Sequence, residues 1–369
     1  MKAKHNYPEL FLNKVGDLYW ATGHPSQKIL PEENWKHSSQ LIHKRVAPEE
    51  INQNKAQLTL VTEYGNIDYL RSGTEGAPVL LLVPGFPDCW YTFHKILPLL
   101  AKDFDVISYS PPGHGYSTYT QKFDFKMDTY CQVLKSVIQR LQLNQVHLIG
   151  HSIGGEQSIR TLLQLKSKKW IKSLTLINAW GPSIFPRKTN WDFTEDVTTW
   201  PIVGMELVRL FGGKLGGMEG AFNRIFHRPE ERPHLQNLKK EYSRPFLNGT
   251  SFNLFINRET AHAICEMQRE QKRINENVRD YFLETRQKYG YLPQIPILVV
   301  GTKHDKIFPY MYARGLFRAI QKHNQQTYFR KIKPSGHMPA IEAPNRLSYQ
   351  IAYFVKKIEE TTTNLEIQK

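Results

Sequence analysis

The sequence is poor in cysteine and contains no long hydrophobic run. Its three cysteines, Cys89, Cys131 and Cys265, are too few and too widely spaced for a disulfide framework or a zinc motif. No stretch approaches the ~18 consecutive apolar residues of a membrane helix, and the charged N-terminus lacks the apolar segment of a secretory signal. These absences predict a cytoplasmic protein of a reducing compartment, without a transmembrane segment and without a metal or other cofactor.

Acidic residues are outnumbered along the 369-residue chain, with 34 Asp and Glu against 49 Lys and Arg. The resulting formal charge of +15 is spread over the chain, and no basic tract is interleaved with aromatic residues. Such a distribution argues against a nucleic-acid partner and predicts a weak attraction to anionic surfaces or substrates. The hydrophobic fraction of 40% is sufficient for a sizeable core. Nothing in the sequence predicts the oligomeric state.

Strand-length apolar segments alternate with helical patterns over most of the chain. Residues 78–83 are apolar without alternation, which is typical of a strand covered on both faces. The dipeptide Gly65-Asn66 lies between two strand-like segments and predicts a hairpin turn. Residues 127–143 and 345–358 carry apolar side chains at helical spacing. Repeated strand–helix–strand units predict an α/β fold with a mostly parallel central sheet and helices on both faces.

This alternating pattern is interrupted once. Residues 56–180 and 293–369 carry the strands and helices of the predicted core. Residues 181–292, which lie between two strands, are rich in Trp, Phe, Arg and Gly and predict a helical insertion. Residues 1–55 precede the pattern as an N-terminal extension, to which we assign no role.

The segment Gly150-His151-Ser152-Ile153-Gly154 follows an apolar strand and precedes a helical pattern. It matches G-x-S-x-G, in which a sharp strand-to-helix turn exposes a serine hydroxyl at the carboxyl edge of a sheet. Glycine at both ends relieves crowding beside the serine, and the start of the following helix favours developing negative charge. We interpret the histidine as packing within the turn. The pentapeptide alone is equally compatible with an ordinary glycine-rich turn.

Two loop residues favour the interpretation of the serine as a nucleophile. Asp305 follows the predicted strand 296–301, and His337 follows the predicted strand 327–332. The chain order of Ser152, Asp305 and His337 is the order expected for this motif. In such a triad the histidine removes the hydroxyl proton, and the carboxylate holds the imidazole in the required tautomer. Each residue alone could be an ordinary loop residue, but their joint placement predicts catalysis.

An acyl-transfer site also needs donors for an oxyanion. Gly85, which follows Pro84 after the strand 79–83, lets the backbone turn so that the N–H of Phe86 can point at the substrate oxygen. The second predicted donor is the N–H of Ile153, which immediately follows the serine. Each donor of this kind contributes roughly 3 kcal/mol of barrier reduction. A simple turn at Gly85 is the alternative.

Taken together, these motifs resemble the α/β-hydrolase superfamily over roughly residues 57–360. The segments PGFPDCWYTF, GHSIGG and SPPGHGYS resemble the branch that holds epoxide hydrolases, haloalkane dehalogenases, carbon–carbon hydrolases and esterases of small esters. The insertion at 181–292 matches the position of that branch's cap, or lid, domain. The resemblance therefore implies an α/β-hydrolase fold with a helical cap.

The chain departs from this branch at three positions. Epoxide hydrolases and dehalogenases carry an aspartate nucleophile, whereas this chain has Ser152, which favours acyl transfer. The oxyanion segment of the branch usually begins with His-Gly, whereas this chain has Pro84 before the glycine. Some relatives place the acid after the preceding strand, where this chain has Asn178, so Asp305 is the predicted acid.

The residues and the resemblance together predict a serine esterase. It would cleave a carboxylic ester of a partly apolar, lipid-like small molecule through an acyl-enzyme. The same triad is compatible with a carbon–carbon bond, a lactone, a thioester or an N-terminal amide as the target, because specificity is set by the cap. A ligand receptor of the same fold with little turnover is a further interpretation. The sequence leaves the natural substrate open.

Overall fold

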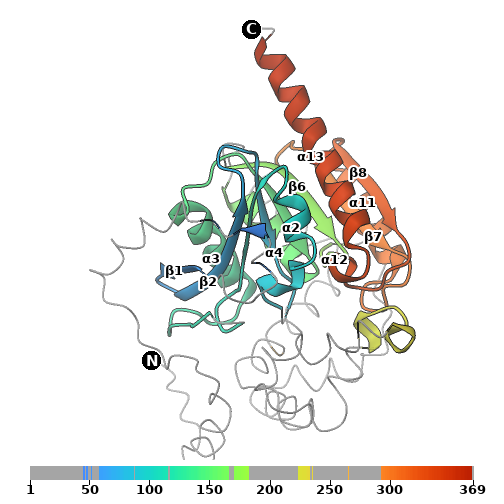
Figure 1. Ribbon diagram of the computed structural model, residues 1–369, viewed down its shortest axis with the longest axis horizontal. Helices are drawn as coiled ribbons and strands as arrows, with labels where there is room; N and C mark the ends of the chain where they lie inside the picture. The colour runs from blue at the N-terminus through green and yellow to red at the C-terminus, as the bar shows by residue number, and fades with distance from the viewer. Residues whose placement is uncertain are drawn as a thin grey trace, which may run out of the picture.

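An eight-stranded sheet forms the centre of the structure, a computed structural model, and helices cover both of its faces (Figure 1). The strand order is β1-β2-β4-β3-β5-β6-β7-β8, which confirms the predicted α/β fold. Most of the predicted extension at 1–55 and of the predicted insertion at 181–292 lies outside the described residues. The structure describes residues 45, 47–48, 51, 58–86, 88–114, 117–165, 170–182, 223–232, 235, 265 and 292–367.

Six strands of the sheet run parallel, and the first two are antiparallel to their neighbours. The apolar residues 80–83 are buried, as predicted for a strand covered on both faces, whereas Tyr328 in the last strand is exposed. In chain order the strands are β1 (Leu58–Thr62), β2 (Gly65–Gly73), β3 (Val79–Val83), β4 (Asp105–Tyr109), β5 (Val146–His151), β6 (Ile171–Ile177), β7 (Ile297–Thr302) and β8 (Thr327–Ile332).

The hairpin between β1 and β2 differs in detail from its prediction. Thr62 pairs with Gly65, so Gly65 begins the second strand and does not form the turn. The glycine is required there because its φ is +142° and because a Cβ at this position would lie 2.3 Å from the Thr118 carbonyl oxygen. The glycine is therefore explained by the close approach of the β2 backbone to the backbone at Thr118.

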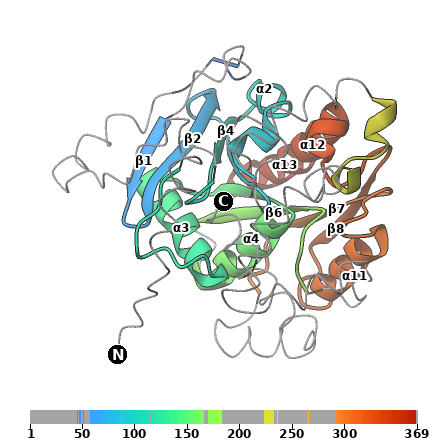
Figure 2. The same ribbon diagram turned by 90° about the horizontal axis from the view of Figure 1, so that it is seen from below.

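The helices form two layers, one on each face of the sheet (Figure 2). One layer holds α3 (Met127–Arg140), α4 (Ile153–Leu165) and α11 (Tyr310–Gln321). The other holds the 3-10 helix η4 (Trp90–Phe93), α2 (Leu97–Leu100), α12 (Pro339–Glu342) and α13 (Pro344–Ile367). A further short 3-10 helix, η5, spans Pro229–Glu231.

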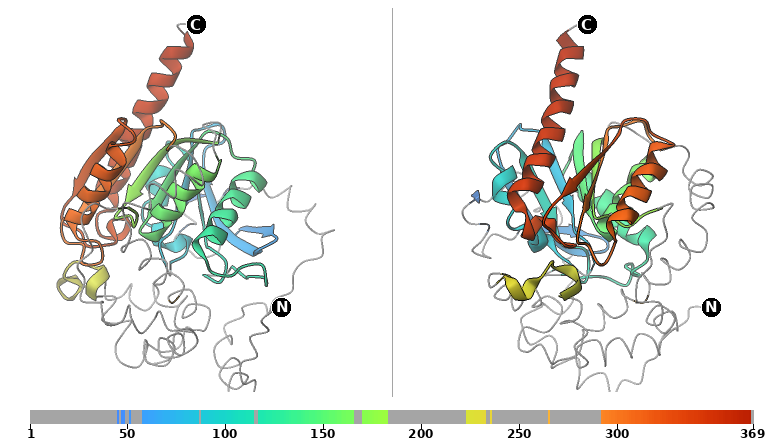
Figure 3. Two further views of the ribbon diagram at one scale, coloured as in Figure 1. Left: turned by 180° about the vertical axis from the view of Figure 1, so that it is seen from behind. Right: turned by 90° about the vertical axis from the view of Figure 1, so that its right-hand side faces the viewer.

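Helix α13 runs beyond the helix predicted for residues 345–358, and its far end extends past the sheet (Figures 1 and 3). Its first turns pack on the sheet through Leu347, Ile351 and Phe354, all of which are buried. None of the helices within the described part of the chain has the length and apolar character needed to cross a membrane.

Parallel strands bring their carboxyl ends to one edge of the sheet, where open α/β sheets bind ligands. The loops that follow β3, β5, β6, β7 and β8 therefore meet at this edge. These loops carry the residues that the sequence singled out.

Candidate active site

Ser152 occupies a strained turn between β5 and α4. Its φ of 54° lies in the left-handed region, which costs a residue with a side chain about 1 kcal/mol or more. Three backbone hydrogen bonds hold it there: its N–H donates to Ile177 O at 3.0 Å, and its carbonyl accepts from Gly155 at 3.0 Å and Trp180 at 2.9 Å. The neighbouring strand β6 thus fixes the turn.

The glycines around this serine are required by close backbone contacts. A Cβ at Gly150 would lie 2.5 Å from Gly154 O, and a Cβ at Gly154 would lie 2.3 Å from Pro84 O. A Cβ at Gly155 would meet the Ala179 Cβ at 2.3 Å. Because backbone atoms and the Ala179 Cβ cannot yield as the end of a flexible side chain can, the chain could not turn here with larger residues.

Three predicted residues form one hydrogen-bonded chain. His337 Nε2 lies 2.9 Å from Ser152 Oγ, and His337 Nδ1 lies 2.8 Å from Asp305 Oδ2. Ser152, Asp305 and His337 are 7%, 5% and 5% exposed, so little water competes for these contacts. The structure therefore brings together side chains from the loops after β5, β7 and β8.

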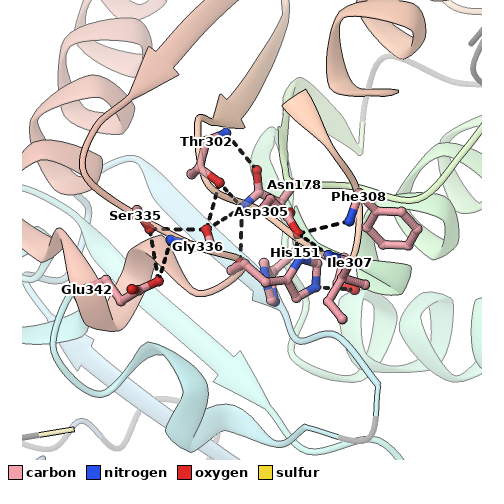
Figure 4. A network of polar contacts seen from close by, with 11 residues as sticks. His151, Asn178, Thr302, Asp305, Ile307, Phe308, Ser335, Gly336 and Glu342 are labelled. Carbon is pink, nitrogen blue, oxygen red and sulfur yellow. Dashed lines mark hydrogen bonds and ion pairs between the residues drawn. The ribbon is translucent and has the colours of Figure 1, made fainter. Parts of the chain in front are cut away.

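Asp305 is oriented by its own loop. Its Oδ1 atom accepts hydrogen bonds from the N–H groups of Ile307 at 2.7 Å and Phe308 at 2.9 Å (Figure 4). These two bonds occupy Oδ1 and leave Oδ2 for His337. The geometry suits a carboxylate that holds the Nδ1–H tautomer of the histidine, which leaves Nε2 free to accept the serine proton.

The backbone of His337 is held by two buried residues. His151 Nε2 donates to the His337 carbonyl at 2.9 Å, and Asn178 Nδ2 donates to the same oxygen at 3.0 Å. Burial lowers the pKa of His151 to about 3, with a further lowering by His337, so this imidazole is neutral at physiological pH. The sequence predicts only a packing role for His151, but in the structure this residue also donates a hydrogen bond to the backbone of His337.

Asn178 joins the loop after β6 to the end of β7 and to the loop after β8 (Figure 4). Its Nδ2 atom also donates to Thr302 Oγ1 at 2.9 Å and to Gly336 O at 3.2 Å, while its Oδ1 atom accepts from Thr302 N at 3.0 Å. The sequence identified Asn178 only as a position without an acid. No sequence signal could have found its role, because its partners are mostly backbone atoms of distant loops.

Phe86 and Ile153, the predicted oxyanion donors, belong to segments that meet at Ser152. A Cβ at Gly85 would lie 2.8 Å from Ser152 Cβ, so the turn after β3 packs directly on the serine. Within the described residues, the backbone hydrogen bonds of turns and loops include none donated by Phe86 or Ile153. Their orientation toward a substrate oxygen stays a prediction.

The side chains of His114, Cys89 and Cys131 are buried and neutral. Burial lowers the pKa of His114 to about 4, and its ring packs edge-on against Phe86 at 5.3 Å. Burial raises the pKa of the Cys89 thiol well above its usual value and that of Cys131 to about 12, so neither forms a reactive thiolate. Among the residues that the structure describes, no three His, Cys, Asp or Glu side chains cluster as metal ligands do.

Comparison with known proteins identifies similar chains. A family model described as the alpha/beta hydrolase fold matches residues 78–344. A Bacillus subtilis (strain 168) protein described as the uncharacterized hydrolase YugF is 23% identical over 295 residues, which cover 79% of this chain and 94% of that protein. Mouse (Mus musculus) epoxide hydrolase 4 is 30% identical over 118 residues, which cover only 32% of each chain.

Among solved structures, an esterase from Exiguobacterium antarcticum superposes with a TM-score of 0.58 at 18% sequence identity. The match covers 79% of this chain and 96% of that chain. At this level of identity the likeness shows a shared fold.

Proposed function

Because this chain belongs to the α/β-hydrolase fold family, we propose that it is a serine hydrolase that cleaves a carboxylic ester of a small molecule. The observation that carries the proposal is the buried contact chain from Ser152 through His337 to Asp305, with distances of 2.9 and 2.8 Å. These distances lie within the range required of a nucleophile, its base and the group that orients the base. The similar esterase structure supports the same reaction class.

In the proposed reaction Ser152 Oγ forms a bond to the ester carbonyl carbon while its proton moves to His337 Nε2. The carbonyl oxygen becomes an oxyanion, for which the N–H groups of Phe86 and Ile153 are the proposed donors. The intermediate then collapses, the bond to the alcohol oxygen breaks, and His337 transfers its proton to that oxygen. A water molecule, deprotonated by His337, next attacks the acyl-serine, and the acid leaves as Ser152 regains its proton.

The nucleophile argues against the epoxide hydrolysis that the name of the mouse relative suggests. Opening of an epoxide by Ser152 would produce an alkyl ether, which water does not cleave under mild conditions. Attack on an ester gives an acyl-serine, which is itself an ester and can be hydrolysed by the same histidine. A serine hydroxyl that must be regenerated therefore favours an acyl substrate.

The substrate that we propose is partly apolar. The aromatic-rich insertion at 181–292 favours a partly apolar, lipid-like acyl or alcohol portion, but this segment lies largely outside the described residues. A lactone, a thioester, an N-terminal amide or a carbon–carbon bond would use the same attack. A receptor of this fold would bind such a molecule with little turnover.

Replacement of the serine tests the proposal. Ser152→Ala should abolish turnover of p-nitrophenyl acetate and labelling by a fluorophosphonate probe, while the circular dichroism spectrum stays unchanged. Ser348, which is also 7% exposed but lies on α13, supplies the matched control, and Ser348→Ala should remain active and labelled. Full activity of Ser152→Ala would refute the assignment. Labelling without multiple turnovers on an ester panel of varied acyl length would indicate the receptor.

A further inference from the structure

Glu342 is a buried carboxylate that takes no part in the proposed reaction. Its side chain is fully buried at the end of α12, five residues after His337. Oxygen Oε2 accepts from Gly336 N at 2.7 Å and from Ser335 Oγ at 3.2 Å (Figure 4). Oxygen Oε1 accepts from His227 N at 2.7 Å and from Arg232 Nη1 at 3.1 Å. One side chain thus binds two segments more than a hundred residues apart in sequence.

The second segment, residues 223–232, lies within the range predicted as the insertion. Figure 3 shows it in yellow beside the loops that follow β7 and β8. Its Ile225 carbonyl accepts a hydrogen bond from the N–H of His337 at 2.6 Å. A Cβ at Gly336 would lie 2.6 Å from the same oxygen and 2.8 Å from His227 N. The segment therefore lies directly on the backbone that carries the proposed general base.

Stability alone does not explain a carboxylate at this position. Burial raises the pKa of Glu342, and the hydrogen bonds from His227 and Gly336 and the charge of Arg232 offset the increase only in part. A buried ion pair of this kind is often no more stabilising than apolar residues of similar volume. What the carboxylate supplies is a fixed arrangement of four donors from two segments.

We propose that Glu342 is a positioning residue, which fixes the backbone of His337 by fastening the loop after β8 and residues 223–232 to one carboxylate. This inference rests on the proposed function, because the position of His337 matters only if it acts as the base. His337 itself is held by Ile225 at its N–H, by His151 and Asn178 at its carbonyl, and by Asp305 at its ring, and Glu342 fastens the segment that carries Ile225. A displacement of about 1 Å of such a group lowers a rate about a hundredfold.

Glu342→Gln is a sharp test because it keeps the shape and changes only the donors and acceptors. Each carboxylate oxygen accepts from one backbone N–H, at Gly336 or at His227. A glutamine has one oxygen and one NH₂ group, so in either orientation one of these two N–H groups loses its acceptor. We expect kcat for p-nitrophenyl acetate to fall by about tenfold to a hundredfold, with KM within about twofold because ester binding is not altered.

Glu359→Gln is the matched control on α13. Glu359 also accepts from two partners, His147 at 2.8 Å and Lys172 at 2.9 Å, but these lie near the amino ends of β5 and β6. This control should lower the unfolding midpoint and leave kcat within about twofold of the unmodified chain. If Glu342 had a purely structural role, Glu342→Gln would also lower the unfolding midpoint and leave kcat unchanged. A fall in kcat in Glu342→Gln but not in Glu359→Gln therefore indicates a positioning role.

Hydrogen–deuterium exchange supplies a readout that does not depend on activity. Peptides covering 333–343 and 223–232 should exchange faster in Glu342→Gln than in Glu359→Gln. If the glutamine variant fails to fold, Gly336→Ala separates the same two segments, because its Cβ would meet the backbone of Ile225 and His227, and it should give the same faster exchange and lower kcat. Unchanged exchange, or faster exchange with unchanged kcat, would overturn the proposal. Absence of fluorophosphonate labelling in the unmodified chain would instead overturn the proposed function, and the exchange result would still decide how the backbone is held.

Discussion

Asn178→Asp is expected to destabilise the protein in a pH-dependent way. The substitution replaces the Nδ2 amide, which faces Thr302 Oγ1 at 2.9 Å and the carbonyls of His337 at 3.0 Å and Gly336 at 3.2 Å, by an oxygen. The acceptor for the Thr302 N–H at 3.0 Å is retained. The change therefore reverses the polarity of a single atom in a residue that is 1% exposed.

The size of the stability loss follows from the partners of that atom. The Thr302 hydroxyl has one hydrogen, which it already donates to Gly336 O at 2.6 Å, so it cannot satisfy the new oxygen without leaving that carbonyl. A buried charged oxygen that faces other acceptors should lower the free energy of unfolding by roughly 3–5 kcal/mol at about pH 8. At about pH 5 the loss should shrink to roughly 1–2 kcal/mol, because a protonated carboxyl group can donate one hydrogen bond.

The direction of the pH dependence follows from the burial of the new carboxyl group. Exclusion of water favours the neutral form of the new carboxyl group, so the folded variant binds a proton more readily than the unfolded chain does. The penalty is consequently small at low pH and grows as pH rises. Urea unfolding at both pH values measures it, with the unmodified chain as the reference at each pH.

Asn324→Asp is the matched control. Asn324 is fully buried, donates to Ile295 O at 2.7 Å and accepts from Gln326 N at 2.9 Å, all at the amino ends of β7 and β8. It should destabilise the protein without changing kcat of the folded fraction, whereas Asn178→Asp should also lower kcat. Equal stability losses at the two pH values, or an unchanged kcat, would refute the network that we describe.

Three further outcomes are expected. Asp305→Asn should lower kcat about ten-thousandfold near pH 7, and an esterase assay that shows less than a tenfold loss would rule out Asp305 as the acid. In Gly85→Ala the new Cβ would lie 2.8 Å from Ser152 Cβ and should push the turn after β3 away from the serine. We expect kcat to fall about a hundredfold with little change in KM. Steady-state kinetics that show a change in KM alone would contradict this. Hydrogen bonds from His147 and Lys172 hold the pKa of Glu359 at about 2, so its contribution is present above its ordinary pKa of 4.5 and is lost as pH falls toward 2. Glu359→Gln should therefore lower the free energy of unfolding by roughly 1–2 kcal/mol at neutral pH, after allowance for partial exposure, and by almost nothing near pH 2. Chemical unfolding that gives the same loss at both pH values would be inconsistent with the lowered pKa.

The sheet and the candidate triad could be predicted because their signals are local. Strands such as Val79–Val83 are continuous apolar runs, and the serine turn combines glycines with a strand before and a helix after. The loop positions of Asp305 and His337 follow from the chain order that this turn implies. Such residues act through their own side chains, so residue type and spacing are sufficient to suggest them.

The supporting residues could not be predicted because their partners are backbone atoms. Asn178 and His151 both bind the His337 carbonyl, over sequence separations of 159 and 186 residues. Every residue carries a backbone carbonyl, so the amino-acid sequence does not indicate which one accepts the hydrogen bond. Glu342 is similar, since two of its four donors are backbone N–H groups. Gly65 was assigned to a turn for the same reason: its actual constraint is the backbone of Thr118.

The wide spacing of the contact chain also bears on how the protein acquires reactivity during synthesis. Ser152 leaves the ribosome 185 residues before His337, and chains are made at about 5–20 residues per second. Ser152 is therefore synthesised roughly ten to forty seconds before His337, its proposed base. In the reaction that we propose, Ser152 needs His337 as its base, so a nascent chain would be unable to attack an ester during this interval. Hydrolysis would begin only after the loop that follows β8 has folded onto the sheet.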